Sequence, residues 1–329
     1  MSLDHPYRSI RVPSDAPFEL RPSPGKGWGA FATRRIERGA LILREEPLFV
    51  DRKPGAEITR QDASEAFRQL TPSQKQQCML LRDNASKGFT SMLAAFTQNS
   101  FTSNPDNGPP HHGLYLLLSR FNHSCIPNSY VSYKGDEVTA SYATRHIVVD
   151  EEITTCYKRG LECQTRRKRH EALHFVCECK ACLPGTPFHK LSEVRRQLIR
   201  GLSYLTKGVD IDGKRQTSVS PIITDPRLKM AAETHRIPLS SILIYEHLIV
   251  VLLEEEDLLC DVLVERISLK LLRLVNLFQT EDNARIARLT MAQGTWLERL
   301  DMAFRLDGRG DAYDCGYASL LRYAVPSFI

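Results

Sequence analysis

Three closely spaced cysteines carry the clearest chemistry in this sequence. The run Cys177-x-Cys179-x-x-Cys182 brings three thiols into six consecutive residues. Thiolates at this spacing can converge on one soft cation, and zinc takes four such ligands at about 2.3 Å in a tetrahedron. The alternative is a group of buried cysteines that pack as small apolar side chains, but Glu178 and Lys180 make the neighbourhood polar. We therefore expect a zinc ion in a structural role, because an all-thiolate site leaves no open position for water.

The fourth zinc ligand has to come from another part of the chain. Cys125 is the best candidate because it ends an unusual run, Asn-His-Ser-Cys, and Cys163 is the second because it is near in sequence. The nine cysteines are an odd number, and a chain kept in a reducing compartment forms few disulfides. The sequence assigns no role beyond packing to Cys78, Cys156, Cys163, Cys260 and Cys315.

Three other segments combine glycines or polar groups in ways that suit a ligand site. In residues 25–29, Gly-Lys-Gly-Trp-Gly, the glycines would let the backbone approach a ligand, although a simple tight turn would also use them. They open no helix, which excludes a dinucleotide-binding fingerprint. Residues 120–128 contain His123 and, taken alone, predict a polar loop with a structural histidine. Residues 150–157 end on Tyr157, which alone would be a half-buried strand tyrosine.

Short β-strands are expected to position these segments. Residues 18–50 and 114–157 hold short apolar runs separated by glycine and proline, and residues 131–140 form a hairpin pattern around a turn at 134–136. Residues 102–113 are so rich in asparagine, proline and glycine that we expect a loop there.

Helices are expected in the rest of the chain. Residues 57–100 suggest short helices, and apolar residues recur three or four apart from about 187 to 304. Within that part, residues 242–253 are apolar on most faces, which predicts a buried helix, and the polar residues 208–226 predict a loop. The basic run 158–171 is expected to be a solvated helix face in preference to a nucleic-acid surface.

Size and composition narrow the class of protein. The chain has 329 residues, of which 42% are hydrophobic and 25% charged, and these values are typical of a globular protein. The net charge of +5 is too small to require a nucleic-acid partner. No apolar run reaches the roughly 18 residues of a membrane span, and the N-terminus lacks the apolar core of a signal peptide. We expect no membrane association and a location in the cytoplasm, the nucleus or both.

The order of the four motifs along the chain indicates a family, which none of the motifs does alone. The glycine segment, the Asn-His-Ser-Cys segment, residues 150–157 and the cysteine triplet, in this order, resemble the SET-domain methyltransferases, most of all the SMYD-type branch and its fungal relatives. The resemblance covers about residues 15–185. It implies an α+β fold of short sheets with a helical insert, a zinc-bound post-SET segment and a helical C-terminal domain. The implied parts are residues 1–56, 57–113, 114–160, 161–186 and 187–329.

The resemblance also implies roles for individual residues. The expected function is methyl transfer from S-adenosylmethionine to a lysine of a protein substrate, histone or non-histone. Tyr157 matches the catalytic tyrosine, Phe175 an aromatic that stacks on adenine, and Asn99 a residue that contacts the amino-acid part of the cofactor. Cys125 matches the cysteine that joins Cys177, Cys179 and Cys182 on zinc. The remaining matches to cofactor-binding positions are Lys26, Gly27, Trp28, Gly29, Asn122 and His123.

The sequence departs from the family pattern in three places. Residues 51–115 hold one cysteine, so the zinc-rich MYND insert is absent. Residues 172–174 lack a second tyrosine that often precedes the stacking aromatic, and the interval from Arg166 to Cys177 is about one residue short. Two alternatives therefore stay open: a SET-fold binding module without turnover, and an enzyme that acts on a small molecule. Nucleic acid is an unlikely partner.

Overall fold

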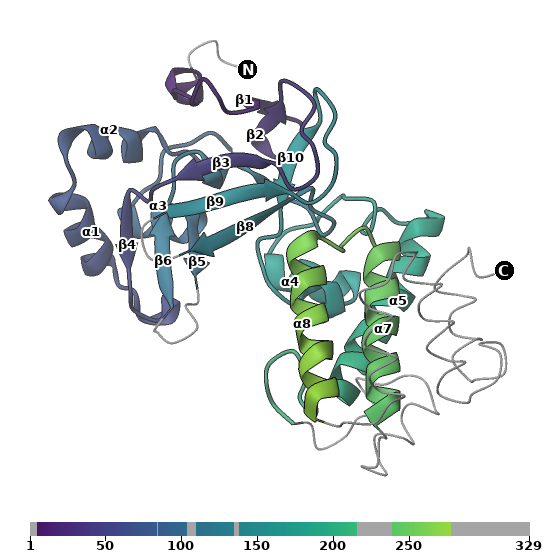
Figure 1. The fold of residues 1–329 in the computed structure, drawn as a ribbon. Coiled ribbons are helices and arrows are strands. Elements are labelled where there is room, and N and C mark those ends of the chain that lie inside the picture. The colour runs from purple at the N-terminus through teal and green to yellow at the C-terminus, as the bar shows by residue number, and fades with distance from the viewer. Residues whose placement is uncertain (1–4, 84, 104–109, 135–137, 216–238, 278–329) are drawn as a thin grey trace. The chain divides into compact units, whose positions relative to one another are not determined.

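The chain forms two units in the computed structural model, which describes residues 5–83, 85–103, 110–134, 138–215 and 239–277 (Figure 1). The first unit draws on residues 1–123 and 127–156, and the second on residues 124–126 and 157–329. The short segment Ser124–Ile126 thus belongs with the C-terminal part of the chain, although it follows directly on a strand of the first unit.

The first unit contains a four-stranded sheet with the order β1-β2-β10-β7. Its strands are β1 (Phe18–Ser23), β2 (Gly27–Ala32), β7 (Asn122–His123) and β10 (Glu152–Thr155). Strand β2 pairs antiparallel with both β1 and β10, whereas β10 pairs parallel with β7. Strand β10 therefore lies between a strand from residues 27–32 and one from residues 122–123, which are far apart in the sequence.

Two three-stranded sheets complete the β-structure of this unit. One has the order β3-β9-β8, with β3 (Leu41–Glu45), β8 (Ser129–Lys134) and β9 (Val138–Ala143); the other has the order β4-β6-β5, with β4 (Phe49–Asp51), β5 (Ser100–Ser103) and β6 (His111–Leu114). The pairing of β8 with β9 confirms the expected hairpin.

The expected loop at residues 102–113 is wrong at both of its ends. Thr102 pairs with His112 and Ser103 with His111 in an antiparallel ladder, and the Thr102 hydroxyl lies 3.0 Å from His112 Nδ1. Strand β6 also pairs with β4 on its other side. Pairing on two sides stabilises a strand in a sequence of low intrinsic strand propensity, because the tertiary context outweighs that propensity.

The first unit has short helices within residues 57–100, as the sequence predicts, and they begin at capping residues. They are α1 (Arg60–Gln69), α2 (Pro72–Leu80) and α3 (Met92–Asn99). Thr59 and Asp62 form a capping box at α1, and Thr71 and Gln74 form another at α2. Such reciprocal bonds satisfy backbone N–H groups that the first helical turn leaves unpaired. Single 3₁₀ turns lie at Pro6–Ser9 (η1), Gly55–Glu57 (η2) and Leu118–Arg120 (η3).

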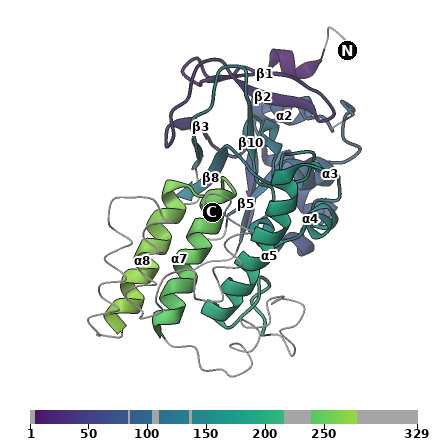
Figure 2. The same ribbon diagram turned by 90° about the vertical axis from the view of Figure 1, so that its right-hand side faces the viewer.

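The second unit is helical, with α4 (Arg166–Leu173), α5 (Pro187–Lys207), α7 (Leu239–Glu255), α8 (Asp261–Leu277) and the 3₁₀ turn η4 (Leu161–Cys163) (Figure 2). Helix α7 packs against α5. Its residues from Leu243 to Leu253 are all buried, and Glu246 and His247 are the polar residues among them. The predicted buried helix is thereby confirmed. Residues 208–215 are outside any helix beyond the cap at Gly208. The rest of the predicted loop, and the helical pattern from 278 to 304, fall outside the described residues.

Two further points concern charge and membranes. Arg169 of α4 is fully buried, so the basic run 158–171 is not simply a solvated helix face as the sequence suggests. Among the described residues, none of the helices is long and apolar enough to cross a membrane.

Candidate functional site

Three of the four sequence motifs become neighbouring strands of one sheet. The glycine segment starts β2, residues 152–155 form β10, and Asn122 and His123 form β7. Backbone pairing aligns Thr154 with Asn122 and Thr155 with His123. Motifs that are about 95 and 30 residues apart in the chain, counted from Gly27 to Asn122 and from Asn122 to Glu152, thus share one small surface of the first unit.

Gly29 is required by its contacts with two polar side chains. A Cβ atom at this position would lie 2.5 Å from Glu152 Oε1 and 2.9 Å from Asn122 Nδ2. Asn122 Nδ2 donates to Glu152 Oε1 at 2.7 Å and to the Trp28 carbonyl at 3.2 Å. The glycine therefore lets β2 approach the Asn122–Glu152 pair, which a side chain would displace.

Glu152 is a site residue that the sequence motifs did not single out. Its carboxylate also accepts hydrogen bonds from the Ser23 hydroxyl and from Lys26 Nζ, each at 2.8 Å. Together with Asn122, three side chains therefore donate to this carboxylate: one from β1, one from the turn between β1 and β2, and one from β7. Its position as the first residue of the strand that leads to Tyr157 could have identified it from the sequence.

Trp28 contributes differently from the glycines beside it. Its side chain is buried and stacks on His5, with ring centroids 4.5 Å apart and an interplanar angle of 22°. The indole therefore belongs to the core of the first unit, and the atoms that Trp28 can offer to a ligand are on its backbone. Gly27 has a φ of +81°, a left-handed conformation that glycine adopts without strain.

Asn99 is held by a buried arginine that the sequence analysis also missed. Asn99 ends α3, and its Nδ2 donates to the Ala95 carbonyl at 2.8 Å. Its Oδ1 accepts a hydrogen bond from Arg120 Nη2, and Arg120 Nη1 donates to the Tyr7 hydroxyl. The Arg120 guanidinium lies 4.6 Å from the centre of the Tyr7 ring. Arg120 lies two residues before the first residue of the Asn-His-Ser-Cys run, and this proximity could have indicated it from the sequence.

The backbone ahead of this run is fixed by a buried carboxylate. Glu45 accepts hydrogen bonds from the N–H groups of Leu116, Leu117 and Leu118 at 2.7–2.9 Å. Burial raises the pKa of Glu45 above its ordinary value, although the three N–H groups oppose this shift. These bonds anchor the segment that leads to Asn122 and His123.

Tyr157 and Phe175 lie together in the second unit. Their ring centroids are 6.4 Å apart with an interplanar angle of 74°, an edge-to-face arrangement. Tyr157 is 44% exposed and Phe175 is 40% exposed. Large aromatic side chains that remain this exposed are available to contact a ligand.

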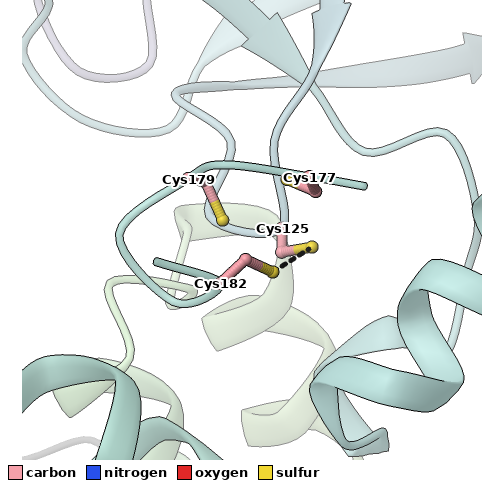
Figure 3. A group of neighbouring side chains, drawn as sticks. All are labelled: Cys125, Cys177, Cys179 and Cys182. Carbon is pink, nitrogen blue, oxygen red and sulfur yellow. Dashed lines mark hydrogen bonds between the residues drawn. The ribbon is translucent and has the colours of Figure 1, made fainter. Parts of the chain in front are cut away.

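The four expected metal ligands converge in the second unit (Figure 3). One sulfur atom from each of Cys125, Cys177, Cys179 and Cys182 lies within 4.8 Å of the other three. Cys125 comes from the segment Ser124–Ile126, and the other three come from the loop after α4. Cys163, the second candidate for the fourth ligand, is not part of this group.

The chemistry of this donor set fits a zinc ion. A tetrahedron with zinc–sulfur bonds of about 2.3 Å needs sulfur atoms about 3.8 Å apart, and Cys125 Sγ and Cys182 Sγ are 3.6 Å apart. Shared hydrogen bonds with Cys125 lower the pKa of Cys179 to about 6, whereas those with its three neighbours raise the pKa of Cys125 above its ordinary value. Four thiols at this spacing cannot all ionise without a cation.

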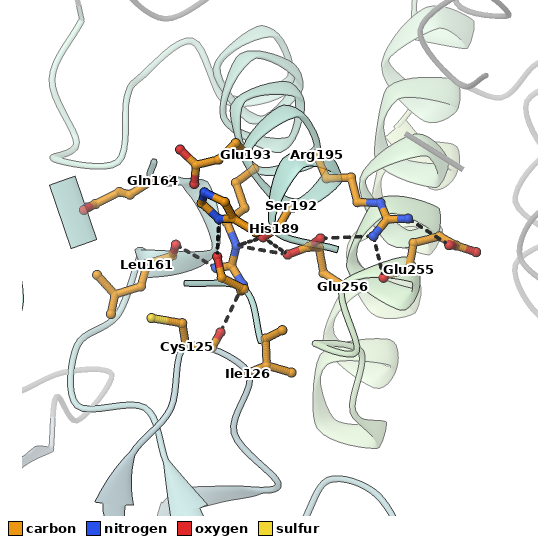
Figure 4. A network of polar contacts seen from close by, with 12 residues as sticks. Cys125, Ile126, Leu161, Gln164, His189, Ser192, Glu193, Arg195, Glu255 and Glu256 are labelled. Atoms are coloured by element: carbon orange, nitrogen blue, oxygen red, sulfur yellow. Dashed lines mark hydrogen bonds and ion pairs between the residues drawn. The ribbon is translucent and has the colours of Figure 1, made fainter. Parts of the chain in front are cut away.

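A polar network of the second unit reaches the backbone of Cys125 (Figure 4). Arg196 donates to the Cys125 carbonyl at 3.0 Å and to the Leu161 carbonyl at 2.9 Å, and its Nε lies 3.0 Å from Glu256 Oε2. Ser192 and Arg195 also bond to Glu256. Helix α5 and the residue after α7 thus hold the backbone of a candidate ligand. This network could not be predicted from local motifs, because its members are spread over about 130 residues.

Comparisons with known proteins identify one domain. Residues 27–158 match the model of the SET domain. The histone-lysine N-methyltransferase set5 of Schizosaccharomyces pombe is 29% identical over 225 residues, which are 67% of this chain and 64% of that protein. The histone-lysine N-methyltransferase SET5 of Eremothecium gossypii is 37% identical over 84 residues (25% and 16%), and human histone-lysine N-methyltransferase SMYD3 is 36% identical over 87 residues (26% and 20%). The chain therefore spans less than two thirds of the length of these relatives.

Proposed function

Because residues 27–158 match the SET domain model, we propose that the protein transfers a methyl group from S-adenosylmethionine to a lysine side chain of a protein. The observation that carries the proposal is the sheet order β2-β10-β7, which places the glycine segment, Glu152 and the Asn122–His123 pair side by side. The three relatives described above are named histone-lysine N-methyltransferases, which supports the proposal.

The cofactor side of the site would use mainly backbone groups. Lys26, Gly27, Trp28 and Gly29 would line the cofactor with their main chain, because the Trp28 indole is buried elsewhere. Asn122 and His123 would contribute from β7. Glu152 acts as a positioning residue, since its bonds to Lys26 and Asn122 keep both in place. Asn99 would contact the amino-acid part of the cofactor, with Arg120 fixing its amide.

The reaction needs alignment and proton removal more than covalent chemistry. The neutral lysine nitrogen forms a bond to the methyl carbon as the carbon–sulfur bond of the sulfonium breaks, and the methylated amine then loses a proton. The Tyr157 hydroxyl would orient the amine, and Phe175 would stack on the adenine ring. Positioning two reactants in this way can supply about 7–11 kcal/mol of a barrier.

A zinc ion would be held by Cys125, Cys177, Cys179 and Cys182, and its contribution is structural cross-linking. Since Cys125 follows His123 by two residues and Cys177 follows Phe175 by two, the four-cysteine site restrains the segments that carry both candidate cofactor contacts. Metal binding of this kind is coupled to folding.

The proposal also includes a class of substrate and a division of the chain into parts. A protein bearing a target lysine, histone or non-histone, in the cytoplasm or the nucleus, is the expected partner. In this scheme residues 1–56 and 114–160 form the two halves of the SET domain, 57–113 its helical insert, 161–186 the post-SET segment and 187–329 the helical C-terminal domain.

Transfer of a labelled methyl group tests this function. The zinc-loaded protein is incubated with S-adenosylmethionine labelled in the methyl group and with core histones or a whole-cell protein extract, and methyllysine is identified by mass spectrometry. Tyr157→Phe should lower turnover by about 10²–10⁴-fold, the usual contribution of a positioned acid–base group, with cofactor affinity unchanged. The control is Tyr204→Phe on α5, which should leave turnover unchanged. Undiminished activity of Tyr157→Phe would remove this residue from the mechanism.

A SET-fold binding module without turnover is the second candidate. The observation that favours it is the stretch Ala172–His174, which offers no tyrosine before Phe175; α4 ends at Leu173, and His174 has a φ of +61°. Cofactor binding by the intact protein, together with no labelled product on any protein mixture, would favour this candidate. Labelled small amines in place of protein would instead point to a small-molecule substrate.

A further inference from the structure

Arg169 is a fully buried cation beside the four cysteines. It lies in α4, and none of its side-chain surface is exposed. Its Nη2 donates to Cys182 Sγ at 3.3 Å and to the Ala181 carbonyl at 3.0 Å. Its Nη1 donates to the Gln164 carbonyl at 2.6 Å and lies 3.3 Å from Glu193 Oε1.

The charge of a filled site explains why a buried arginine belongs here. A divalent cation with four thiolates carries two net negative charges, and burial of uncompensated charge is costly. A guanidinium in direct contact with one thiolate offsets part of this charge, and its N–H group draws electron density from the sulfur. Glu193, the carboxylate facing Arg169, retains 26% of its side-chain exposure, so water screens it better than the sulfur atoms.

A second arginine of α4 holds the same segment without touching the sulfur. Arg166 Nε donates to the Cys182 carbonyl at 2.7 Å, and His170 Nε2 accepts a hydrogen bond from the Cys177 backbone N–H at 3.2 Å. Three side chains of one helix therefore shape the loop that carries three of the cysteines. Of these three side chains, Arg169 is the one that donates to a cysteine sulfur atom.

We infer that Arg169 is a positioning residue of the metal site, which stabilises the metal-bound form by compensating the charge on Cys182. The inference depends on the proposed zinc site but not on methyl transfer. It assigns a purpose to the only arginine of the basic run that is completely buried among the described residues. Loss of a group that supports a metal ligand typically lowers metal affinity by about 10–100-fold.

The test compares metal binding by three purified, full-length proteins. Arg169→Met keeps a long side chain without charge. Arg167→Met is the matched control, because Arg167 lies in the same helix with a 78% exposed side chain paired to Glu171. Zinc affinity is measured by competition with a chromophoric chelator. The cobalt-substituted proteins also give a sulfur-to-cobalt charge-transfer band, which reports the electron density on the thiolates.

The expected result is a zinc affinity about 10–100-fold lower for Arg169→Met and a charge-transfer band shifted to lower energy, with neither change in Arg167→Met. A purely structural role of Arg169 would not move the band in a protein that still binds cobalt. Parent-like zinc affinity and an unshifted band in Arg169→Met would overturn the inference. If the unmodified protein binds no zinc at all, both the metal site and the inference are refuted.

A second variant decides the question if Arg169→Met does not fold. Arg169→Lys keeps the charge but replaces the forked donor by a single ammonium group. It should fold, bind zinc more weakly than the unmodified protein and shift the cobalt band by less than full charge removal would. Affinity and band position equal to those of the unmodified protein would show that neither the fork nor its bond to Cys182 matters, and would overturn the inference.

Discussion

The β2-β10-β7 sheet and the four-cysteine site are positioned by different forces. In the sheet, backbone ladders align Gly29, Asn122 and Glu152, and the polar side chains among them satisfy one another. At the cysteines, the candidate ligands lie in loops with little regular structure. Arginine side chains hold the backbone of two of these ligands: Arg166 donates to the Cys182 carbonyl and Arg196 to the Cys125 carbonyl.

This difference predicts how each region responds to change. The sheet needs no external ion to fold. We therefore expect its stability to fall mainly where a substitution adds an atom that clashes with a packed neighbour. The cysteine region combines four thiols with buried cations and carboxylates, so its sensitivity is electrostatic. We expect the stability of this region to fall where a substitution leaves a buried charged group without a partner of opposite charge.

The largest effect is expected for Cys179→Ser, which tests the four-cysteine site. Loss of one ligand should release zinc and unfold the loop that carries Cys177 and Cys182, because structural zinc contributes roughly 10 kcal/mol or more to small metal-dependent folds. Zinc content by atomic absorption and thermal unfolding give the answer. The control, Cys260→Ser, changes a cysteine of similar partial exposure outside the group. A normal zinc content in Cys179→Ser would refute the metal assignment.

The next effect is expected for Glu256→Gln, which removes a charge from the helical network. Glu256 is fully buried and pairs with Arg196 at 3.0 Å and Arg195 at 3.3 Å. Breaking such a pair leaves buried guanidinium groups undercompensated and should cost about 3 kcal/mol or more of the free energy of unfolding.

The neighbouring Glu255→Gln provides the control for that experiment. Glu255 pairs with Arg195 at 3.2 Å, but its side chain is 31% exposed, so its loss should cost less than about 1 kcal/mol. Urea denaturation of both variants measures the contrast. Equal destabilisation would mean that burial of the charge does not govern this region.

A smaller effect on stability is expected for Gly29→Ala, which tests the steric sensitivity of the sheet. The added Cβ atom would clash with Glu152 Oε1, and relief of the clash should cost about 1–3 kcal/mol. Cofactor affinity should fall as well, since Asn122 and Glu152 must move. Gly88→Ala is the matched control because its Cβ atom would meet no atom within 4 Å. Parent-like stability and cofactor affinity in Gly29→Ala would contradict a packed β2–β10 contact.

The sequence predicted regular elements and local motifs better than the contacts among them. The short helices within residues 57–100, the β8–β9 hairpin and the burial of α7 follow from local chemistry and periodicity, and they agree with the structure. The ends of the 102–113 segment were predicted as loop, because a sheet neighbour far away in the sequence decides their conformation.

The residues of the candidate site could likewise be identified from the sequence only in part. The four cysteines could be identified from their types, their spacing and the family resemblance, and the structure brings them together. Glu152, Arg120, Arg169 and Arg196 could not, because acidic and basic side chains are common on surfaces and their burial depends on tertiary packing. Partners of this kind come from the three-dimensional arrangement.

Cofactor binding is the most direct test of the proposal that the β2-β10-β7 sheet forms a methyl-donor site. Calorimetric titration of the zinc-loaded protein with S-adenosylmethionine, and separately with its demethylated product S-adenosylhomocysteine, requires no knowledge of the substrate. We expect saturable binding of at least one of them with micromolar affinity. No binding at millimolar ligand, with zinc present and the fold intact by circular dichroism, would contradict the assignment of the β2-β10-β7 sheet to a methyl-donor site.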